Sequence, residues 1–301
     1  MKNGKKVKIV EIGPRDGFQS VKEFIPAETK INIIDQLVGA GVSKIQVGSF
    51  VSPKAIPQMR DVTEVVSNVI HKHLDTDFFA LVPNLYGAKA AVTAGLREIT
   101  SVISLSESHN IANINRTVAK SIEEIARIRD VFPDIVLSLD IATVFACPFE
   151  GKMEIAPLID LISKLCQFQV RELTLCDTIG MAYPSQIRDV LTAVKKAFPE
   201  VAFNLHIHDT LNMGILNTYI GILHGVNSVQ VSLGGLGGCP FAPGASGNTA
   251  TEDIVYLLHQ EGFETGIDFE KLLDSAKYLY ERVGGNYSGH HIKIKPETCC
   301  A

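Results

Sequence analysis

The sequence predicts an α/β protein, a (β/α)8 TIM barrel with a short C-terminal helical extension. Eight short apolar runs alternate with amphipathic segments, and no long linker separates them. The length of 301 residues suffices for one barrel of about 250 residues plus extensions. The alternative is a doubly wound open sheet, which needs a glycine-rich phosphate-binding turn after its first strand. The corresponding segment, GPRDG at 13–17, lacks that pattern, so the barrel is favoured.

Each of the eight runs is short and mostly apolar, as expected for parallel strands that are buried on both faces. The predicted strands are Val7–Gly13, Lys44–Ser49, Phe78–Pro83, Glu98–Ser104, Val136–Ala142, Glu172–Cys176, Phe203–His208 and Ser228–Leu233. The helices predicted between them include Ala27–Val38, Ile122–Val131, Ile155–Leu165, Ser185–Ala197 and Gly214–Leu223. Pro184 is typical of a helix start, and Gly39 and Gly225 are typical of helix ends.

One further amphipathic segment, Phe269–Arg282, follows the eighth unit and predicts the C-terminal helix. We therefore expect a single domain over residues 1–301. In this interpretation the barrel covers about residues 7–260, and the C-terminal helix and tail cover about residues 265–301.

Composition excludes several classes of protein. Hydrophobic residues make up 46% of the chain and charged residues 20%, which predicts a compact core rather than disorder. A formal net charge of −5 without a cationic cluster argues against a nucleic-acid partner. No apolar run is long enough for a membrane span, no secretory signal is recognised, and the six cysteines lack metal-binding spacing. These features predict a cytoplasmic protein with reduced thiols.

Polar residues gather where predicted strands end, which is where barrel enzymes place their chemistry. His206 and His208 are two residues apart, so both side chains leave the same face of an extended strand. Two imidazoles at the barrel mouth can ligate one divalent ion. An isolated pair of this kind fits equally well with one histidine in the barrel wall and one at the surface.

The loops after the first and eighth strands supply further candidates. Arg15 and Asp16 lie in a Gly/Pro-framed loop, where they form either a surface turn or a fixed cation beside a carboxylate ligand. Residues 234–248 form a glycine-rich segment that ends at Asn248 and suggests a mobile lid over a substrate. Two histidines, one aspartate and one asparagine make an oxygen-rich shell, which favours Mg2+ or Mn2+ over structural zinc.

With these residues, the chain resembles the 3-hydroxy-3-methylglutaryl-CoA (HMG-CoA) lyase family. This family belongs to the metal-dependent TIM-barrel lyases and Claisen-type synthases that are named for an Asp-Arg-Glu signature. The similarity runs over nearly the whole chain. It is carried by the segments VEIGPRDGFQ (10–19), SFVSPK (49–54), CPFEGK (147–152), DTIG (177–180), HIHDT (206–210) and GLGGCPFAPGASGNTATEDIVYLL (235–258). The last segment is the most specific, because it resembles the lyase loop rather than that of the related synthases.

The resemblance implies a divalent-metal-dependent carbon–carbon lyase that cleaves HMG-CoA, an acyl-CoA thioester, to acetyl-CoA and acetoacetate. It also implies a homodimer with a place in leucine catabolism and ketone body metabolism. The implied metal ligands are Asp16, His206, His208 and Asn248, and the implied catalytic residues are Arg15, Cys239, Asp177 and His206. Arg15 would stabilise the enolate oxygen, Cys239 would act as acid/base, and Asp177 would assist proton transfer. The implied substrate contacts are Arg15, Gln46, Ser49, Asn113, Ser138, Thr174 and Glu252.

These metal ligands and catalytic residues suit a retro-Claisen cleavage. This reaction needs a metal to lower the pKa of the substrate hydroxyl, a cation for the leaving enolate and a proton donor for the nascent acetyl group. A thiol can serve as that donor when nearby cations bring its pKa toward neutrality.

Two positions depart from the family pattern. Gln46 stands where the signature has a glutamate, so it can accept a hydrogen bond from Arg15 but brings no negative charge. Ser138 stands where the lyases carry an arginine, and it or Asp140 is expected to reshape the pocket. These departures keep two alternatives open: a lyase acting on a related substrate such as citramalyl-CoA, and a non-catalytic paralogue that binds acyl-CoA. A Claisen-type synthase of the same superfamily is a third alternative, against which the cysteine in the glycine-rich segment argues.

Overall fold

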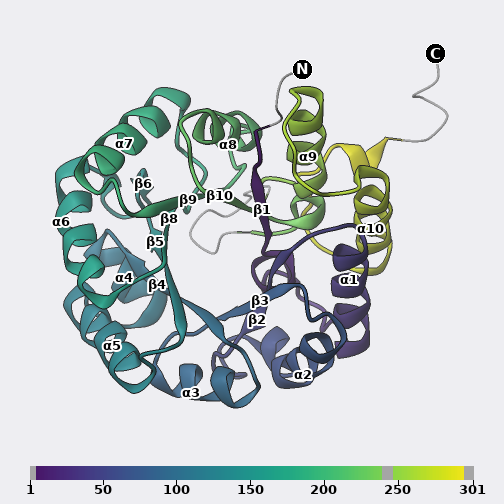
Figure 1. Cartoon of the computed structure of the whole chain (residues 1–301), viewed down its shortest axis with the longest axis horizontal. Helices are drawn as coiled ribbons and strands as arrows, with labels where there is room; N and C mark the ends of the chain where they lie inside the picture. Colours follow the sequence, from purple (N-terminus) through teal and green to yellow (C-terminus); the bar gives the residue numbers. More distant parts are fainter. Residues whose placement is uncertain (1–4, 239–246, 295–301) are drawn as a thin grey trace.

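A computed structural model describes residues 5–238 and 247–294 of the chain. Eight parallel strands close into a barrel in the order β1-β10-β9-β8-β5-β4-β3-β2, and helices form a ring around it (Figure 1). The barrel strands are β1 (Lys8–Glu11), β2 (Lys44–Ser49), β3 (Asp77–Leu81), β4 (Glu98–Ser104), β5 (Val136–Ala142), β8 (Glu172–Asp177), β9 (Ala202–Ile207) and β10 (Ser228–Val231). The predicted (β/α)8 barrel is therefore confirmed.

The helices connect successive strands and cover the outside of the barrel. They are α1 (Ala27–Gly39), α2 (Val62–Lys72), α3 (Leu85–Thr93), α4 (Glu107–Ile114), α5 (Val118–Val131), α6 (Ile155–Leu165), α7 (Pro184–Ala197), α8 (Gly214–Leu223), α9 (Thr251–Gln260) and α10 (Phe269–Arg282). A short antiparallel hairpin, β6 (Ala146–Cys147) with β7 (Gly151–Lys152), follows β5. No helix in the described part of the chain has both the length and the apolar character needed to cross a bilayer.

The predicted boundaries agree with the structure to within two residues, except that the helix predicted over Ile122–Val131 begins four residues earlier, at Val118, because Thr117 caps it there. Smaller differences have local causes. The first strand was predicted to reach Gly13 but ends at Glu11, because residues 13–17 form a π-helical turn. Pro184 does begin α7, and Gly225, with φ of 75°, does follow α8. The prediction for Gly39 is wrong: α1 includes this residue, and the left-handed position that ends the helix is Gly41, with φ of 95°.

The strands divide their side chains between two environments. Alternate positions such as Leu173 and Leu175 on β8 join the hydrophobic core between barrel and helices. The interior of the barrel contains few apolar residues, and Val10, Ile12 and Phe79 form a small separate cluster. The remaining alternate positions carry polar groups, all buried: Lys44, Gln46, Glu98, Ser138, Asp140, Glu172, Thr174, Asn204, His206 and Gln230. The barrel therefore encloses an unusually polar interior, and each of these groups needs a partner.

At the amino-terminal end of the barrel, Lys44 supplies a partner for two carboxylates. Its Nζ lies 2.5 Å from Glu98 Oε1 and 3.4 Å from Glu172 Oε2. These three residues are the first of β2, β4 and β8, so the ion triad lies opposite the ends that carry the predicted site. Asn204 Nδ2 donates a further hydrogen bond to Glu172 at 2.9 Å.

The segment after α10 crosses the loop that follows β10. Tyr287 pairs with Leu236 as an antiparallel bridge, and Gly289 N donates to Gly234 O at 3.0 Å. Ser288 Oγ donates to the carbonyl oxygen of Asn248 at 2.6 Å. The segment after α10 therefore contacts Gly234 and Leu236 before residues 239–246, and Asn248 after them. Helix α10 itself packs against α1 and α9 (Figure 1).

Candidate metal-binding active site

Asp16 and Arg15 are positioned by the π-helical turn that follows β1. The backbone N–H of Asp16 donates to Ile12 O at 2.8 Å, and the N–H of Phe18 donates to Gly13 O, which closes the turn. Gly13 begins it, and a Cβ at this position would come within 2.6 Å of Glu11 Oε1. Both charged side chains are buried, and Arg15 Nη1 donates to Asp16 Oδ1. Of the two interpretations of this pair, the fixed cation beside a carboxylate is therefore the one that the structure supports.

His206 and His208 lie at the carboxyl end of β9 and both face the barrel interior. His208 follows directly after the strand, and the ring centroids of the two histidines are 4.9 Å apart. One ligand atom from each, together with one from Asp16, all lie within 4.8 Å of one another. Both imidazoles are buried, so the interpretation that places one of them at the surface is wrong.

Asn248 completes the group from the loop before α9. Its Nδ2 donates to Asp16 Oδ2 at 2.9 Å and to Leu236 O at 3.1 Å. Its Oδ1 is buried and has no hydrogen-bond partner among the described residues. Gly247, with φ of 110°, allows the backbone turn that brings Asn248 to this place.

The protonation states of the cluster suit metal ligation. Burial alone would raise the pKa of Asp16, but Arg15 and the two imidazoles outweigh it and hold this pKa at about 2. Burial, followed by the neighbouring His208, lowers the pKa of His206 to about 3. Burial likewise lowers the pKa of His208. At neutral pH the site therefore presents an ionised carboxylate and neutral imidazoles, the protonation states that ligate metals.

These donors fit a divalent cation. They combine one carboxylate oxygen, two imidazole nitrogens and an amide oxygen that lacks any other described partner. The predominance of oxygen and nitrogen without thiolate suits a hard or borderline ion. The observed cluster thus contains the ligand types that the sequence predicted.

Gln46 is confirmed as a neighbour of Arg15. Arg15 Nε donates to Gln46 Oε1, while Gln46 Nε2 is buried and without a partner in the described residues. Ser49, at the end of β2, has a buried hydroxyl that also lacks a described partner. Both residues therefore offer unused polar atoms at the carboxyl half of the barrel.

Asp177 and Thr174 lie on β8 and are fully engaged with protein groups. The carboxylate of Asp177 accepts backbone N–H groups from Met181 at 3.1 Å and Ala182 at 3.0 Å. Burial raises its pKa to about 6 despite these bonds. Thr174 Oγ1 accepts a hydrogen bond from Gln230 Nε2 at 3.0 Å. A catalytic role for Asp177 and a substrate contact for Thr174 stay predictions.

The remaining candidates lie in three different environments. Ser138 Oγ lies 3.5 Å from Glu98 Oε1, which directs it toward the ion triad. Asn113 is exposed on α4. Glu252 is fully buried in the first turn of α9, accepts Gly234 N at 2.9 Å, and has its pKa raised to about 8 by burial and then by Asp253. Cys239 lies outside the described residues.

Sequence reasoning missed two glutamines that contact the cluster. Gln19 Nε2 donates to Asp16 Oδ1 at 2.8 Å. Gln230 Oε1 lies 3.2 Å from His206 Nδ1. The sequence pattern could have indicated Gln230 in one way. It lies at an alternate, inward-facing position of the predicted strand Ser228–Leu233, next to the strand that carries the two histidines.

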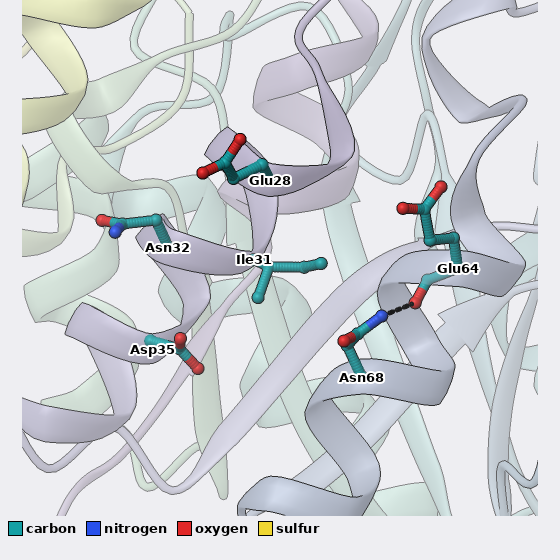
Figure 2. Close-up of a pocket in the computed structure, with 6 residues that line it drawn as sticks. All are labelled: Glu28, Ile31, Asn32, Asp35, Glu64 and Asn68. Carbon is teal, nitrogen blue, oxygen red and sulfur yellow. Dashed lines mark hydrogen bonds between the residues drawn. The ribbon is translucent and has the colours of Figure 1, made fainter.

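A separate hollow lies on the outer surface between α1 and α2 (Figure 2). It is lined by Glu28, Ile31, Asn32, Asp35, Glu64 and Asn68. None of the site residues predicted from the sequence lines this hollow.

Comparisons with known proteins place the chain in a family. Residues 6–279 match the HMGL-like family. Hydroxymethylglutaryl-CoA lyase YngG of Bacillus subtilis is 40% identical over 292 residues, which cover 96% of this chain and 97% of that protein. The crystal structure of the Bacillus subtilis HMG-CoA lyase has a TM-score of 0.92 at 39% identity, covering 97% of this chain and 99% of that one. An HMG-CoA lyase from Acinetobacter baumannii, solved with coenzyme A and 3-methylmalate, also has a TM-score of 0.92, at 36% identity over 98% of this chain and 97% of that one.

Proposed function

This chain belongs to the HMG-CoA lyase (HMGL-like) family, and we propose that it cleaves HMG-CoA to acetyl-CoA and acetoacetate by a metal-dependent retro-Claisen reaction. The observation that carries the proposal is the convergence of Asp16, His206 and His208 within 4.8 Å of one another. Arg15, hydrogen-bonded to Asp16, places a cation at the same carboxyl end of the barrel. That is the end at which barrel enzymes carry out their chemistry.

The reaction breaks one carbon–carbon bond and moves one proton. The tertiary hydroxyl loses its proton, its oxygen becomes the ketone of acetoacetate, and the electrons of the broken bond form the enolate of acetyl-CoA. A proton then adds to that enolate carbon. A divalent cation bound to Asp16, His206, His208 and Asn248 would lower the pKa of the substrate hydroxyl.

The protein's own groups supply the remaining requirements. Arg15 is buried, and its guanidinium is already oriented by Asp16 and Gln46. A preorganised cation in a site that excludes water stabilises a developing enolate oxygen without reorganisation. We assign the final proton donor to Cys239 on the basis of the sequence, because its segment joins the end of the β10 loop to Asn248.

Mg2+ or Mn2+ is the metal that we propose, because the donor set is rich in oxygen and contains no thiolate. The proposed substrate is a CoA thioester, in keeping with the coenzyme A present in the Acinetobacter relative. We further expect a cytoplasmic homodimer.

A second substrate class is favoured by one observation. Gln46 is neutral, and its Nε2 has no partner among the described residues, so it can donate to a substrate oxygen where a glutamate could only accept. This feature suits a related 3-hydroxyacyl-CoA such as citramalyl-CoA.

The test is a direct assay. Purified protein is mixed with HMG-CoA and Mg2+ or Mn2+, and acetoacetate is followed, with citramalyl-CoA and other 3-hydroxyacyl-CoA thioesters assayed in parallel. His208→Ala should reduce turnover by orders of magnitude, whereas His71→Ala, which alters an exposed histidine on α2, should leave it unchanged. Cleavage of citramalyl-CoA alone would replace HMG-CoA as the substrate. No product from any thioester would refute the lyase assignment.

A further inference from the structure

Gln230 occupies an inward-facing position of β10 directly beside the metal-site strand. Its Cα partner across the parallel pair β10/β9 is His206. Its side chain is buried, with 7% exposure, and Gln230 Oε1 lies 3.2 Å from His206 Nδ1. The amide oxygen of Gln230 therefore contacts the imidazole of His206 at Nδ1.

The orientation of this amide is fixed by its other hydrogen bonds. Gln230 Nε2 lies 3.2 Å from Asp140 Oδ1 and 3.0 Å from Thr174 Oγ1. Its two N–H groups therefore have two acceptors. Rotating the amide by half a turn would place Oε1 against the Asp140 carboxylate, which repels it.

Asp140 and Thr174 lie side by side. They are Cα partners in the β5/β8 pair, and the Thr174 hydroxyl counteracts the rise that burial causes in the pKa of the Asp140 carboxyl. Both side chains accept a hydrogen bond from Gln230 Nε2, so the three form one connected set. Three strands thus determine which end of the Gln230 amide faces the histidine.

We propose that Gln230 is a positioning residue for His206: its oxygen accepts the Nδ1–H of this histidine and so directs Nε2 to the divalent cation. An acceptor-only partner requires the hydrogen on Nδ1, and the unprotonated Nε2 then carries the lone pair that ligates the metal. The proposal deepens the proposed function, because it rests on His206 as a metal ligand.

The two histidines differ in this respect. His208 Nδ1 has no hydrogen-bond partner among the described residues, and its Nε2 lies 3.9 Å from Asp16 Oδ2. Only His206 therefore has a described protein group that selects its tautomer. The set formed by Asp140, Thr174 and Gln230 therefore selects the tautomer of His206 and not that of His208.

The first measurement is Mn2+ affinity, determined by calorimetry on the full-length protein without substrate. Gln230→Met removes the acceptor with little change in length, and it should weaken Mn2+ binding by about 10- to 100-fold, as losses of such supporting hydrogen bonds do. Gln36→Met, on the outer helix α1, is the matched control and should bind Mn2+ as the unaltered protein does. A change of less than about twofold in folded Gln230→Met, with folding checked by circular dichroism, would overturn the proposal.

The second measurement needs no variant. Two-bond proton–nitrogen NMR spectra of the 15N-histidine-labelled, Mg2+-loaded protein report the tautomer of His206, which should carry its hydrogen on Nδ1. A hydrogen on Nε2 would overturn the proposal, even if Gln230→Met fails to fold.

Activity provides a third readout that a purely structural role would not produce. Turnover by Gln230→Met should recover as Mn2+ is raised, because the defect lies in metal affinity; no recovery would contradict the proposal. Mn2+ binding and the NMR spectrum do not require turnover. Failure of HMG-CoA cleavage would therefore remove the proposed function without deciding the role of Gln230.

Discussion

Replacing Lys44 with methionine should lower the free energy of unfolding by about 3–5 kcal/mol, because it leaves buried carboxylates without their cation. Lys44 is 3% exposed, and its partners Glu98 and Glu172 are 9% and 7% exposed. The Nζ also lies 5.2 Å from the centroid of the Phe79 ring, a cation–π contact that methionine would lose. Water cannot readily replace the lost charge in this packed barrel end.

The expected loss is large for a protein domain, whose total stability is commonly about 5–15 kcal/mol. With a urea slope of about 3 kcal/mol/M, suited to a chain of this length, the unfolding midpoint should fall by about 1–1.7 M. Urea unfolding followed by far-ultraviolet circular dichroism measures this shift. The slope itself should stay constant, since the surface exposed on unfolding is unchanged.

Lys72→Met provides the matched control. Lys72 also pairs with a carboxylate, that of Asp35, but its side chain is 58% exposed. Exposed ion pairs contribute about 0–1 kcal/mol, so the control midpoint should move little. Equal shifts of the urea midpoint in Lys44→Met and Lys72→Met would refute the reasoning. Burial of the ion triad would then add nothing to the free energy of unfolding.

Three further outcomes are expected. Burial raises the pKa of Glu252 from 4.5 to about 8. The stability that the protonated Glu252 side chain contributes is therefore complete below pH 4.5 and is lost as pH rises through 8. Over this interval, the urea midpoint of Glu252→Gln should fall less than that of the unaltered protein. Gln46→Glu should raise turnover of HMG-CoA, because the new carboxylate would pair with Arg15 and the unpartnered amide N–H of Gln46 would be removed. Unchanged or reduced activity would indicate that the protein is adapted to another substrate. Cys239→Ala should lower turnover by orders of magnitude with an unchanged melting temperature, and full activity would reject the thiol as acid/base.

The repeating pattern of the chain was sufficient to predict the barrel. Alternation of buried strands with amphipathic helices is a local property, so it appears directly in the sequence. Helix α7 begins at Pro184 and the strand β2 covers Lys44–Ser49, both as predicted. The first strand is shorter than predicted because residues 13–17 form a π-helical turn, whose backbone hydrogen bonds replace strand pairing.

The metal cluster could be anticipated because its residues occupy strand ends that a closed barrel brings together. His206 and His208 are close in the sequence, and Asp16 follows the first strand. Gln230 could not be recognised in the same way. A glutamine in a strand carries no motif, and its contact with His206 depends on the register of β10 against β9.

The sequence by itself determined the alternating strands and helices, the ligand types at the strand ends and the family resemblance, because each depends on residue identity and short spacing. The tertiary structure alone decided which buried polar groups meet. Lys44 reaches Glu172, 128 residues away, and Gln230 reaches Asp140, 90 residues away. Such pairs are set by strand order and register around the closed barrel, and burial in that interior gives them their energetic weight.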